Sequence, residues 1–367
     1  MPWRWRVPTS LRLERPARGS AAMSRIIVAG GTGFFGAALV GLLRSEGIQP
    51  VLAARHGPVD IRMDVEDPDA LRSVLRPGDL VLDAVGPFQG RSTALVEAAI
   101  EIGVDLIDLS DSLDYSERLT ELETQIAQSG IRVLTACSSI SVGSAALIRL
   151  SKIDSPVEAS GFLVPAARHV AWPGTGSSLL NSVGRPIRVW QNGALVAKRG
   201  WGEARQFEFP RPLGMTTGYL FESADALMLP RVWPGLRAVD FFVSSNVPGF
   251  NDVFRAAARW KWVRDLIVRT TPLGLAVARR IGGRIGCLAY RIEDRAGRRA
   301  RLGLIGPDRS YLTPVAPMVL AAKRIAAGRF EPLGLVPVDQ QVEAVELIEY
   351  LATLGVQLVR LEDPLVG

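Results

Sequence analysis

The sequence predicts an α/β protein that joins a doubly wound parallel sheet to a second domain with a mixed, mainly antiparallel sheet. From Ser24 to about Leu150, short apolar runs alternate with helical periodicity, which is typical of βαβ units. From about Val157 onward, strand-like runs follow one another and hairpin-type turns such as 192–194 connect some of them. The 367 residues suffice for two domains with separate cores.

The first predicted strand, 26–29, leads into a glycine-rich turn and then a helix from residue 37. The turn consists of Gly30, Gly31, Thr32, Gly33, Phe34, Phe35 and Gly36, which includes the spacing G-x-G-x-x-G. Its glycines permit a tight turn, close approach of a pyrophosphate and close packing of helix on strand. Free N–H groups at the helix start attract the anion. The sequence therefore predicts a Rossmann-type dinucleotide site.

The residue after the second predicted strand, 50–54, indicates the cofactor. Arg55 stands close to where NAD-specific sites carry a carboxylate for the ribose. A guanidinium pairs with a 2′-phosphate through two hydrogen bonds, so NADP(H) is the preferred cofactor and NAD(H) the alternative. The competing interpretation makes Arg55 an ordinary surface arginine. The third strand, 61–65, would place Asp64 and Val65 beside the adenine, although Asp64 also suits a plain strand end.

Three further strands complete the predicted nucleotide domain, and their carboxyl ends meet at one edge of the sheet. The remaining elements are strands 79–85, 105–109 and 131–136 and helices 92–102, 115–129 and 142–150. Gly86 and Pro87 follow the first of these strands and predict a rigid wall for the nicotinamide ribose, with Phe88 against the ring. The alternative is a stiff turn without a ligand.

The rest of the chain predicts a substrate domain and a C-terminal return. Strand-like runs occupy 159–164, 187–191, 195–199, 206–209, 239–244, 287–293 and 300–305, and helices are expected at 312–328 and 339–354. The resulting domains are a basic extension at 1–22, the nucleotide domain at 23–150, the substrate and oligomerisation domain at 151–310, and C-terminal helices at 311–367 that pack back onto the nucleotide domain. The extension fits a leader, a disordered tail or an early start codon, and a nonfunctional extension is favoured.

A reduction needs a proton donor within hydrogen-bond reach of the substrate. Asp108 and Asp111 lie at the end of a predicted strand, and His169 is one of two histidines. All three are candidate proton donors. The alternatives are that the aspartates cap the next helix and that His169 is a surface or satisfied histidine. Arg168 would bind a substrate carboxylate. Thr175 and Ser177, in a Gly-Thr-Gly-Ser-Ser helix start, would bind an anion or simply cap the helix.

Composition excludes several classes of protein. Two distant cysteines exclude a disulfide framework and indicate a reducing cytosol, and two histidines make a metal site unexpected. No apolar run reaches the eighteen residues of a membrane span. Positive charge gathers in residues 1–25 and 251–301 without a nucleic-acid-binding module. Residues 253–288 interleave Trp and Leu with arginines, which predicts either packed helices broken at Pro272 or peripheral contact with a membrane.

The motifs together resemble a known family. Residues 28–36, 52–55, 83–88 and 104–111 are similar to the saccharopine dehydrogenase-like NAD(P)-binding proteins, and residues 136–141 and 174–178 resemble theirs too. The resemblance is good over roughly 24–150 and only general beyond. It implies an NADP-type Rossmann domain followed by an α/β substrate domain, and it leaves the reaction open.

The sequence thus predicts a cytoplasmic, homodimeric NADP(H)-dependent oxidoreductase. Hydride would pass to or from an imine, carbonyl or enoyl group of a small-molecule or lipidic substrate. The alternative is a non-catalytic nucleotide-binding protein that docks on a membrane surface or a protein partner. No lysine occurs before Ser151, so a Lys/His catalytic pair cannot come from the nucleotide domain. No nucleic-acid partner is expected.

Overall fold

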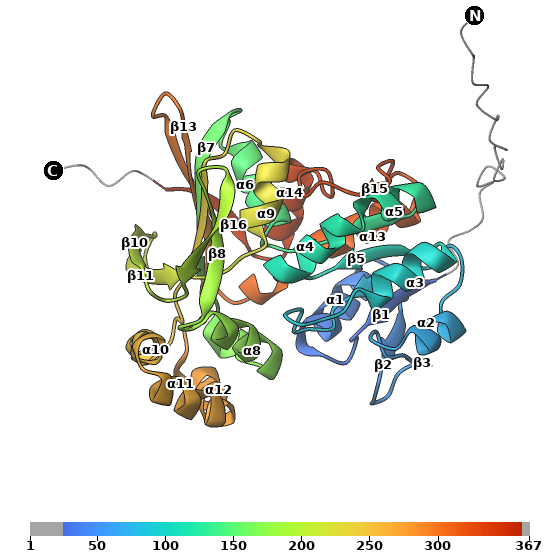
Figure 1. Ribbon diagram of the computed structural model, residues 1–367, viewed down its shortest axis with the longest axis horizontal. Coiled ribbons are helices and arrows are strands. Elements are labelled where there is room, and N and C mark those ends of the chain that lie inside the picture. The colour runs from blue at the N-terminus through green and yellow to red at the C-terminus, as the bar shows by residue number, and fades with distance from the viewer. Residues whose placement is uncertain (1–24, 362–367) are drawn as a thin grey trace, which may run out of the picture.

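Two β-sheets organise residues 25–361, the part of the chain that the computed structural model describes (Figure 1). The predicted extension at residues 1–22 lies outside these residues. A seven-stranded parallel sheet and a nine-stranded, mostly antiparallel sheet stand on opposite sides of the molecule, with helices between them (Figure 1). The predicted fold class is therefore confirmed.

The parallel sheet and its helices take up the first third of the chain. They are β1 Ile26–Ala29, α1 Phe34–Ser45, β2 Val51–Ala54, β3 Ile61–Arg62, α2 Pro68–Val74, β4 Leu80–Asp83, α3 Ala94–Ile102, β5 Asp105–Asp108, α4 Leu113–Glu121, α5 Glu123–Ser129 and β6 Arg132–Leu134. The strand order is β15-β6-β5-β4-β1-β2-β3. Strand order therefore reverses between β1 and β4, and this is where a doubly wound sheet opens the crevice that binds ligands.

Both faces of the parallel sheet are covered, which explains why β1 and β4 are apolar throughout most of their length. Val28 of β1 and Leu82 of β4 belong to one core, shared with the second sheet. Ile27 and Val81 point the other way, into a core formed with α2 to α5. Alternate side chains of a strand face opposite sides, so each strand contributes to both cores.

The second unit follows β6. Its elements are α6 Val142–Leu150, β7 Pro156–Val164, α7 Ala167–Val170, α8 Pro173–Ser182, β8 Pro186–Gln191, β9 Ala194–Arg199, β10 Ala204–Glu208, β11 Met215–Leu220, α9 Asp225–Val232, β12 Ala238–Val243, α10 Phe250–Arg259, α11 Lys261–Arg269, α12 Thr271–Ile281, β13 Gly286–Asp294 and β14 Arg299–Gly306. The main strand order is β10-β11-β12-β7-β13-β14-β16. Neighbouring strands are antiparallel except β7 and β12.

The C-terminal segment returns to both sheets. It contains the 3₁₀ turn Ser310–Leu312, α13 Ala316–Ala326, β15 Gly334–Leu335, α14 Ala344–Thr353 and β16 Gln357–Arg360. Helix α13 contacts α1, β15 pairs with β6 in the parallel sheet, and β16 pairs with β14 in the other. The sequence indicated only the helices, because strands of two and four residues carry almost no periodicity.

Several predicted helices differ in detail. The helix expected at 115–129 is divided into α4 and α5 at Leu122. The segment 253–288 forms three helices, because the chain turns at Trp260 as well as near Pro272, which lies in the first turn of α12. Within residues 25–361, no helix is long and apolar enough to cross a membrane.

Candidate functional site

The turn between β1 and α1 has the geometry of an anion cradle. Gly30 has a φ of 75°, a left-handed conformation that favours glycine. The amide of Gly33 donates to the carbonyl of Gly30 over 2.8 Å, and Gly33 caps the helix without a side chain. A Cβ at Gly36 would lie 2.0 Å from the Gly30 oxygen. Helix and turn therefore touch, and the unpaired N–H groups of the first helical turn face the crevice.

The segment after β2 lies next to this turn. A Cβ at Gly57 would lie 3.6 Å from the Thr32 methyl group, so the two segments are in contact. Arg55 remains 64% exposed, and its guanidinium is 3.9 Å from the Asp64 carboxylate. Val65 is buried in the core below. The structure thus places Arg55 and Asp64 at the surface near the glycine turn, whereas Val65 packs inside.

The segment after β4 is fixed by a buried ion pair. Arg91, only 7% exposed in its side chain, lies 3.1 Å from the buried carboxylate of Asp83 and also pairs with Glu66. Its guanidinium donates to the carbonyl of Val85 over 2.7 Å. Phe88 packs beside Arg91 and against the ring of Tyr115, at 5.3 Å between centroids. Phe88 is therefore mainly a core residue at the base of the wall that Gly86 and Pro87 form.

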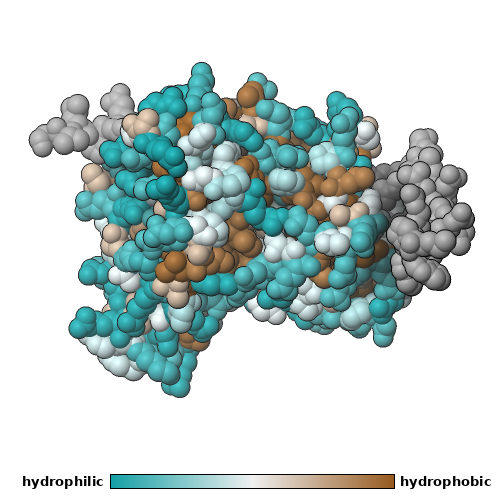
Figure 2. Space-filling model, turned by 45° about the horizontal axis from the view of Figure 1, so that its top comes forward, coloured by the Kyte–Doolittle hydropathy of each residue, from teal (hydrophilic) through white to brown (hydrophobic). Residues whose placement is uncertain are grey.

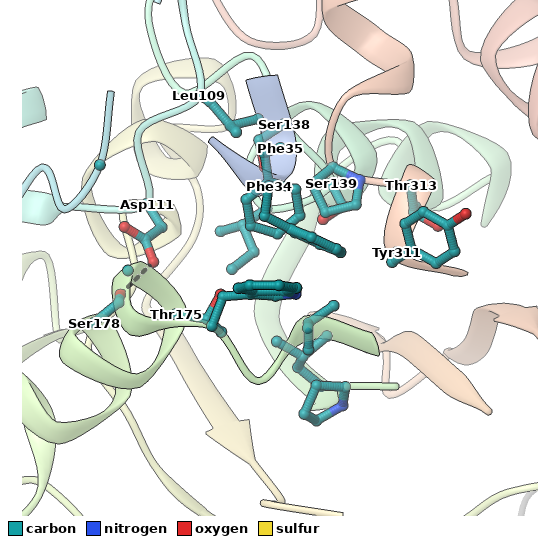
Figure 3. A pocket seen from close by; sticks show the side chains of 18 of the residues that line it. Phe34, Phe35, Leu109, Asp111, Ser138, Ser139, Thr175, Ser178, Tyr311 and Thr313 are labelled. Carbon is teal, nitrogen blue, oxygen red and sulfur yellow. Dashed lines mark hydrogen bonds between the residues drawn. The ribbon is translucent and has the colours of Figure 1, made fainter. Parts of the chain in front are cut away.

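A cavity of about 860 Å³ opens at the carboxyl ends of β1, β4 and β5, between the two sheets. The glycine turn borders it, with Phe34 and Phe35 among its walls. Most of the other lining residues are apolar, and within the described chain Asp111 is the charged residue among them. Figure 3 shows Asp111 and Ser178 at one side of this cavity and Tyr311 and Thr313 at the other.

Aromatic rings connect the two units over the cavity. The rings of Phe34 and Trp172 stack with their centroids 5.7 Å apart, and Tyr311 lies 5.8 Å from Phe34. Phe34 comes from the glycine turn, Trp172 precedes α8, and Tyr311 belongs to the C-terminal segment. Three distant parts of the chain thus meet at this cavity.

A polar cluster interrupts the apolar wall. Ser178 donates to Asp111 over 2.7 Å, and the Gln89 amide donates to both residues over 3.1 to 3.2 Å. Gln89 does not itself line the cavity, and its Oε1 is buried without a hydrogen-bond partner among the described residues. Burial raises the pKa of Asp111, and the hydrogen bonds from Ser178 and Gln89 partly oppose that rise.

Asp108 lies outside the cavity. Its side chain is fully buried, and Oδ1 accepts from the backbone amides of Ser110 and Ala136 over 3.0 and 2.9 Å. Burial raises the pKa of Asp108 to about 6 despite these hydrogen bonds. The residue links the ends of β5 and β6, which is a structural task and not the proton donation that the sequence suggested.

The candidates on the second unit are divided between the cavity and other surfaces. Thr175 lines the cavity, whereas Ser177 is exposed and its neighbour Ser178 takes the place inside. Arg168 is turned away, with Nε donating to the carbonyl of Gly282 over 3.2 Å. His169 is half-buried behind Tyr311, 5.6 Å between ring centroids, and does not line the cavity. Arg168, His169 and Ser177 are therefore not brought to the site.

Gln89, Ser178 and Trp172 were missed by sequence reasoning. Ser178 stands one position from the predicted Ser177, and helical spacing could have distinguished them only with the position of α8 known. Gln89 follows Gly86–Phe88 directly, so its place beside the wall could have been inferred. No His, Cys, Asp and Glu cluster suited to a metal ion occurs in residues 25–361.

The fold and the glycine cradle define an NAD(P)-binding protein of the Rossmann class. Residues 46–134 match the family described as the saccharopine dehydrogenase NADP binding domain. This segment is therefore similar to the NAD(P)-binding domain of saccharopine dehydrogenase-like proteins, which confirms the resemblance. The match begins after the glycine turn, so the turn itself is identified by its geometry.

Two relatives share part of this domain. An Arabidopsis thaliana protein named "Probable mitochondrial saccharopine dehydrogenase-like oxidoreductase" is 30% identical over 80 residues, 22% of this chain and 18% of that protein. The "Lipid droplet localized protein" of Caenorhabditis elegans is 31% identical over 75 residues, 20% of this chain and 18% of that protein. The matched segment thus spans less than a fifth of either relative.

The complete fold resembles a solved enzyme. Saccharopine dehydrogenase (L-Glu forming) from Saccharomyces cerevisiae superposes with a TM-score of 0.62 at 15% identity, over 92% of this chain and 99% of that one. At this identity the likeness concerns the fold, and it extends through both sheets.

Proposed function

We propose that this protein is an NADP(H)-dependent oxidoreductase that transfers hydride to or from a carbonyl, imine or enoyl group on a largely apolar substrate. The proposal rests on one observation: the glycine turn and the cavity lie next to each other at the same edge of the parallel sheet. The glycine cradle opens directly into a large, mostly apolar cavity, and the polar cluster around Asp111 contributes the one charged side chain of its described lining. Apolar walls with few polar groups are typical of sites for small organic ligands.

The residues present fit a dinucleotide. The N–H groups at the start of α1 would hold the pyrophosphate, because glycines at 33 and 36 leave the backbone accessible. Arg55 would pair with the 2′-phosphate, and Gly86 and Pro87 would flank the nicotinamide ribose. When bound, the nicotinamide supplies or accepts the hydride. Phe34 and Trp172 would exclude water from the crevice.

Asp111 would supply the proton. It stands in the cavity wall with a raised pKa, so a larger share of the carboxyl is protonated near neutral pH than for an exposed aspartate. Ser178 and Gln89 hold its orientation through one hydrogen bond each, and a third hydrogen bond joins Gln89 to Ser178. In this arrangement the Asp111 carboxyl donates a proton to the substrate atom that becomes negative during reduction.

The cavity favours a hydrocarbon substrate over a polyacid. Its described lining contains no lysine, arginine or histidine, so a substrate carboxylate would find no cationic partner there. Leu163, Val243 and Leu288 instead offer apolar contact. Each methylene group buried against such walls contributes about 0.8 kcal/mol. Affinity should therefore increase with chain length until the cavity is full.

The first test is a titration with NADPH and NADH, followed by thermal unfolding, because a ligand of the native state raises stability with its concentration. We expect tighter binding of NADPH. Arg55→Ala should weaken NADPH about tenfold or more and leave NADH within about twofold, since a charge-assisted hydrogen bond contributes about 1.5–3 kcal/mol. Arg295→Ala, at an exposed hairpin of the second sheet, is the control. Equal weakening of both cofactors would contradict the assignment of Arg55.

The second test measures turnover of aldehydes and 2-enoyl thioesters with chains of about four to sixteen carbons, which span the sizes of ligand that a cavity of this volume accommodates. We expect kcat/KM with NADPH to rise with chain length. NADPH binding without turnover at any length would contradict the oxidoreductase proposal and support a non-catalytic nucleotide-binding protein.

A further inference from the structure

Helices α10, α11 and α12 form a projecting lobe, residues 250–281, at the lower left of Figure 1. Their inner faces are packed. Phe254 of α10 is buried edge-on against the ring of Trp201, with 5.0 Å between centroids. Ala278 of α12 is buried beside α7, and Leu275 lies against Gly176 of α8. The inner faces therefore hold the lobe against the rest of the fold, whereas its outer faces are exposed.

The outer faces expose large apolar side chains. Exposed members of the lobe are Val253, Trp260, Trp262, Leu266, Val268, Leu273 and Ile281. Trp262 and Leu273 are 68% and 67% exposed. Trp262 and Leu266 are four residues apart on α11 and so share one face of that helix. Helix α11 has no buried residue at all, which is unusual for a nine-residue helix with five apolar side chains.

Positive charge accompanies these side chains. Residues 250–284 contain eight Lys and Arg against two Asp, a net charge of +6. Within this described segment only Arg255 and Lys261 form ion pairs, with Asp252 and Asp265, and both pairs are exposed. The other cations of this segment form no direct ion pair among the described residues, although Arg264 and Arg269 lie close enough to act on Asp265 through their charge. In Figure 2 the lobe projects at the lower left and presents mainly hydrophilic residues to the viewer, in keeping with these arginines.

The lobe adjoins the wall of the apolar cavity. Arg279 of α12 lies over the ring of Trp172 at 5.4 Å and donates to the carbonyl of Ala171 over 2.7 Å. Trp172 lines the cavity and stacks on Phe34 of the glycine turn. Helix α12 also contacts α8, which contributes Thr175 and Ser178 to the cavity. The lobe therefore contacts elements that line the candidate site.

We propose that this lobe docks on an anionic lipid bilayer and holds the apolar cavity beside it. Tryptophan and leucine side chains interleaved with an excess of arginines over carboxylates match an interface that is apolar below and negatively charged at its surface. A second copy of the chain would bring the same positive charge against itself, which opposes self-association through this face. That the cavity takes its substrate from the bilayer rests on the proposed function, whereas docking itself does not.

The test is sedimentation of the full chain with vesicles of phosphatidylcholine alone or with phosphatidylglycerol at about a third of the lipid. We expect binding to the anionic vesicles that weakens with salt, because the Debye length falls from about 10 Å at 0.1 M to about 3 Å at 1 M, and weaker binding to the neutral vesicles. No binding of the wild type to anionic vesicles at 0.1 M salt would overturn the proposal. This measurement needs no cofactor or turnover, so its failure is distinct from failure of the proposed function.

Variants identify the face. Trp262→Ser with Leu273→Ser should lower the vesicle partition coefficient at least about tenfold, since two large apolar contacts are lost. The matched control is Met215→Ser with Leu333→Ser, which are 59% and 57% exposed outside the lobe. Arg269→Glu with Arg280→Glu should also lower partition about tenfold or more. Equal partition of lobe and control variants, with unchanged melting temperatures, would overturn the proposal. So would light scattering that shows a dimer which only the lobe variants dissociate.

Discussion

The Ser178 hydroxyl donates to the Asp111 carboxylate over 2.7 Å, and this hydrogen bond crosses from one unit of the protein to the other. Asp111 follows β5 of the parallel sheet, whereas Ser178 lies in α8 beside the second sheet. The Asp111 carbonyl also accepts from the amide of Ala224 over 3.2 Å. The candidate proton donor is therefore positioned by both units, so its orientation depends on how they meet.

The pH dependence of reduction should identify Asp111. A carboxyl that donates a proton is active below its pKa, so the reduction rate should fall as pH rises through the raised pKa of Asp111. Asp111→Asn should remove this dependence and lower kcat by about 10²–10⁴, with the NADPH dissociation constant within about twofold. The measurement is kcat from pH 5 to 9 with a substrate found in the turnover test.

Ser178→Ala provides the matched comparison. The Ser178 hydrogen bond lowers the pKa of Asp111, so its loss should move the fall in rate to higher pH while leaving Asp111 in place. A merely structural effect would reduce the rate equally at all pH values. An unchanged pH profile in both variants would exclude Asp111 as the donor.

Gly36 should tolerate no side chain. In Gly36→Ala the new methyl group would meet the Gly30 oxygen at 2.0 Å, so the start of α1 must move from the turn. We expect loss of NADPH binding by at least about tenfold and destabilisation by about 1–3 kcal/mol. Gly41→Ala, in the same helix with no atom within 4 Å of the added Cβ, should stabilise by about 0.5–1 kcal/mol. Titration with NADPH and urea unfolding compare the two variants. Equal NADPH affinity and equal stability of both variants would contradict the role of the glycine turn as the NADPH-binding cradle.

The strand, glycine turn and helix at the start of the parallel sheet were predictable because their signals are local. A four-residue apolar strand and three glycines at fixed spacing depend on neighbours in sequence. The polar cluster was not, because Gln89 and Ser178 are 89 positions apart and meet only once the second sheet is in place. Asp108 is the last residue of β5 and Asp111 follows three positions later, yet Asp108 is buried against the end of β6 whereas Asp111 lines the cavity. Sequence spacing of three residues does not reveal which of them solvent reaches.

Arg91 should be essential for stability, although it lies outside the cavity. Arg91→Met would leave the Asp83 carboxylate buried without its cation, which costs about 3–5 kcal/mol. It would also free the segment that contains Gly86 and Pro87, because the bond to the Val85 carbonyl is lost. Arg72→Ala removes an exposed pair with Glu101 at 3.0 Å and should cost less than about 1 kcal/mol. Urea unfolding compares them, and equal losses would refute the structural role of Arg91.

Asp108 should make the protein less stable as pH rises. Its pKa increases from 3.8 to about 6 on folding, so the native state holds the proton more tightly than the unfolded chain does. Stability contributed by this group is therefore full below about pH 4 and is lost as pH rises through about 6. Between pH 5 and pH 8 the loss amounts to about 1–2 kcal/mol.

Asp108→Asn removes that titration and keeps an oxygen for the amides of Ser110 and Ala136. Its new amide group lies where Asp108 Oδ2, which has no hydrogen-bond partner among the described residues, stood before. We expect the variant to be at least as stable as the wild type at pH 8, and the wild type to gain about 1–2 kcal/mol relative to it at pH 5. Urea unfolding of both proteins at the two pH values measures this difference. If the free energy of unfolding changed equally with pH in both proteins, Asp108 would be ionised in the folded protein at both pH values. Interactions other than the hydrogen bonds from Ser110 and Ala136 would then have to stabilise its buried charge.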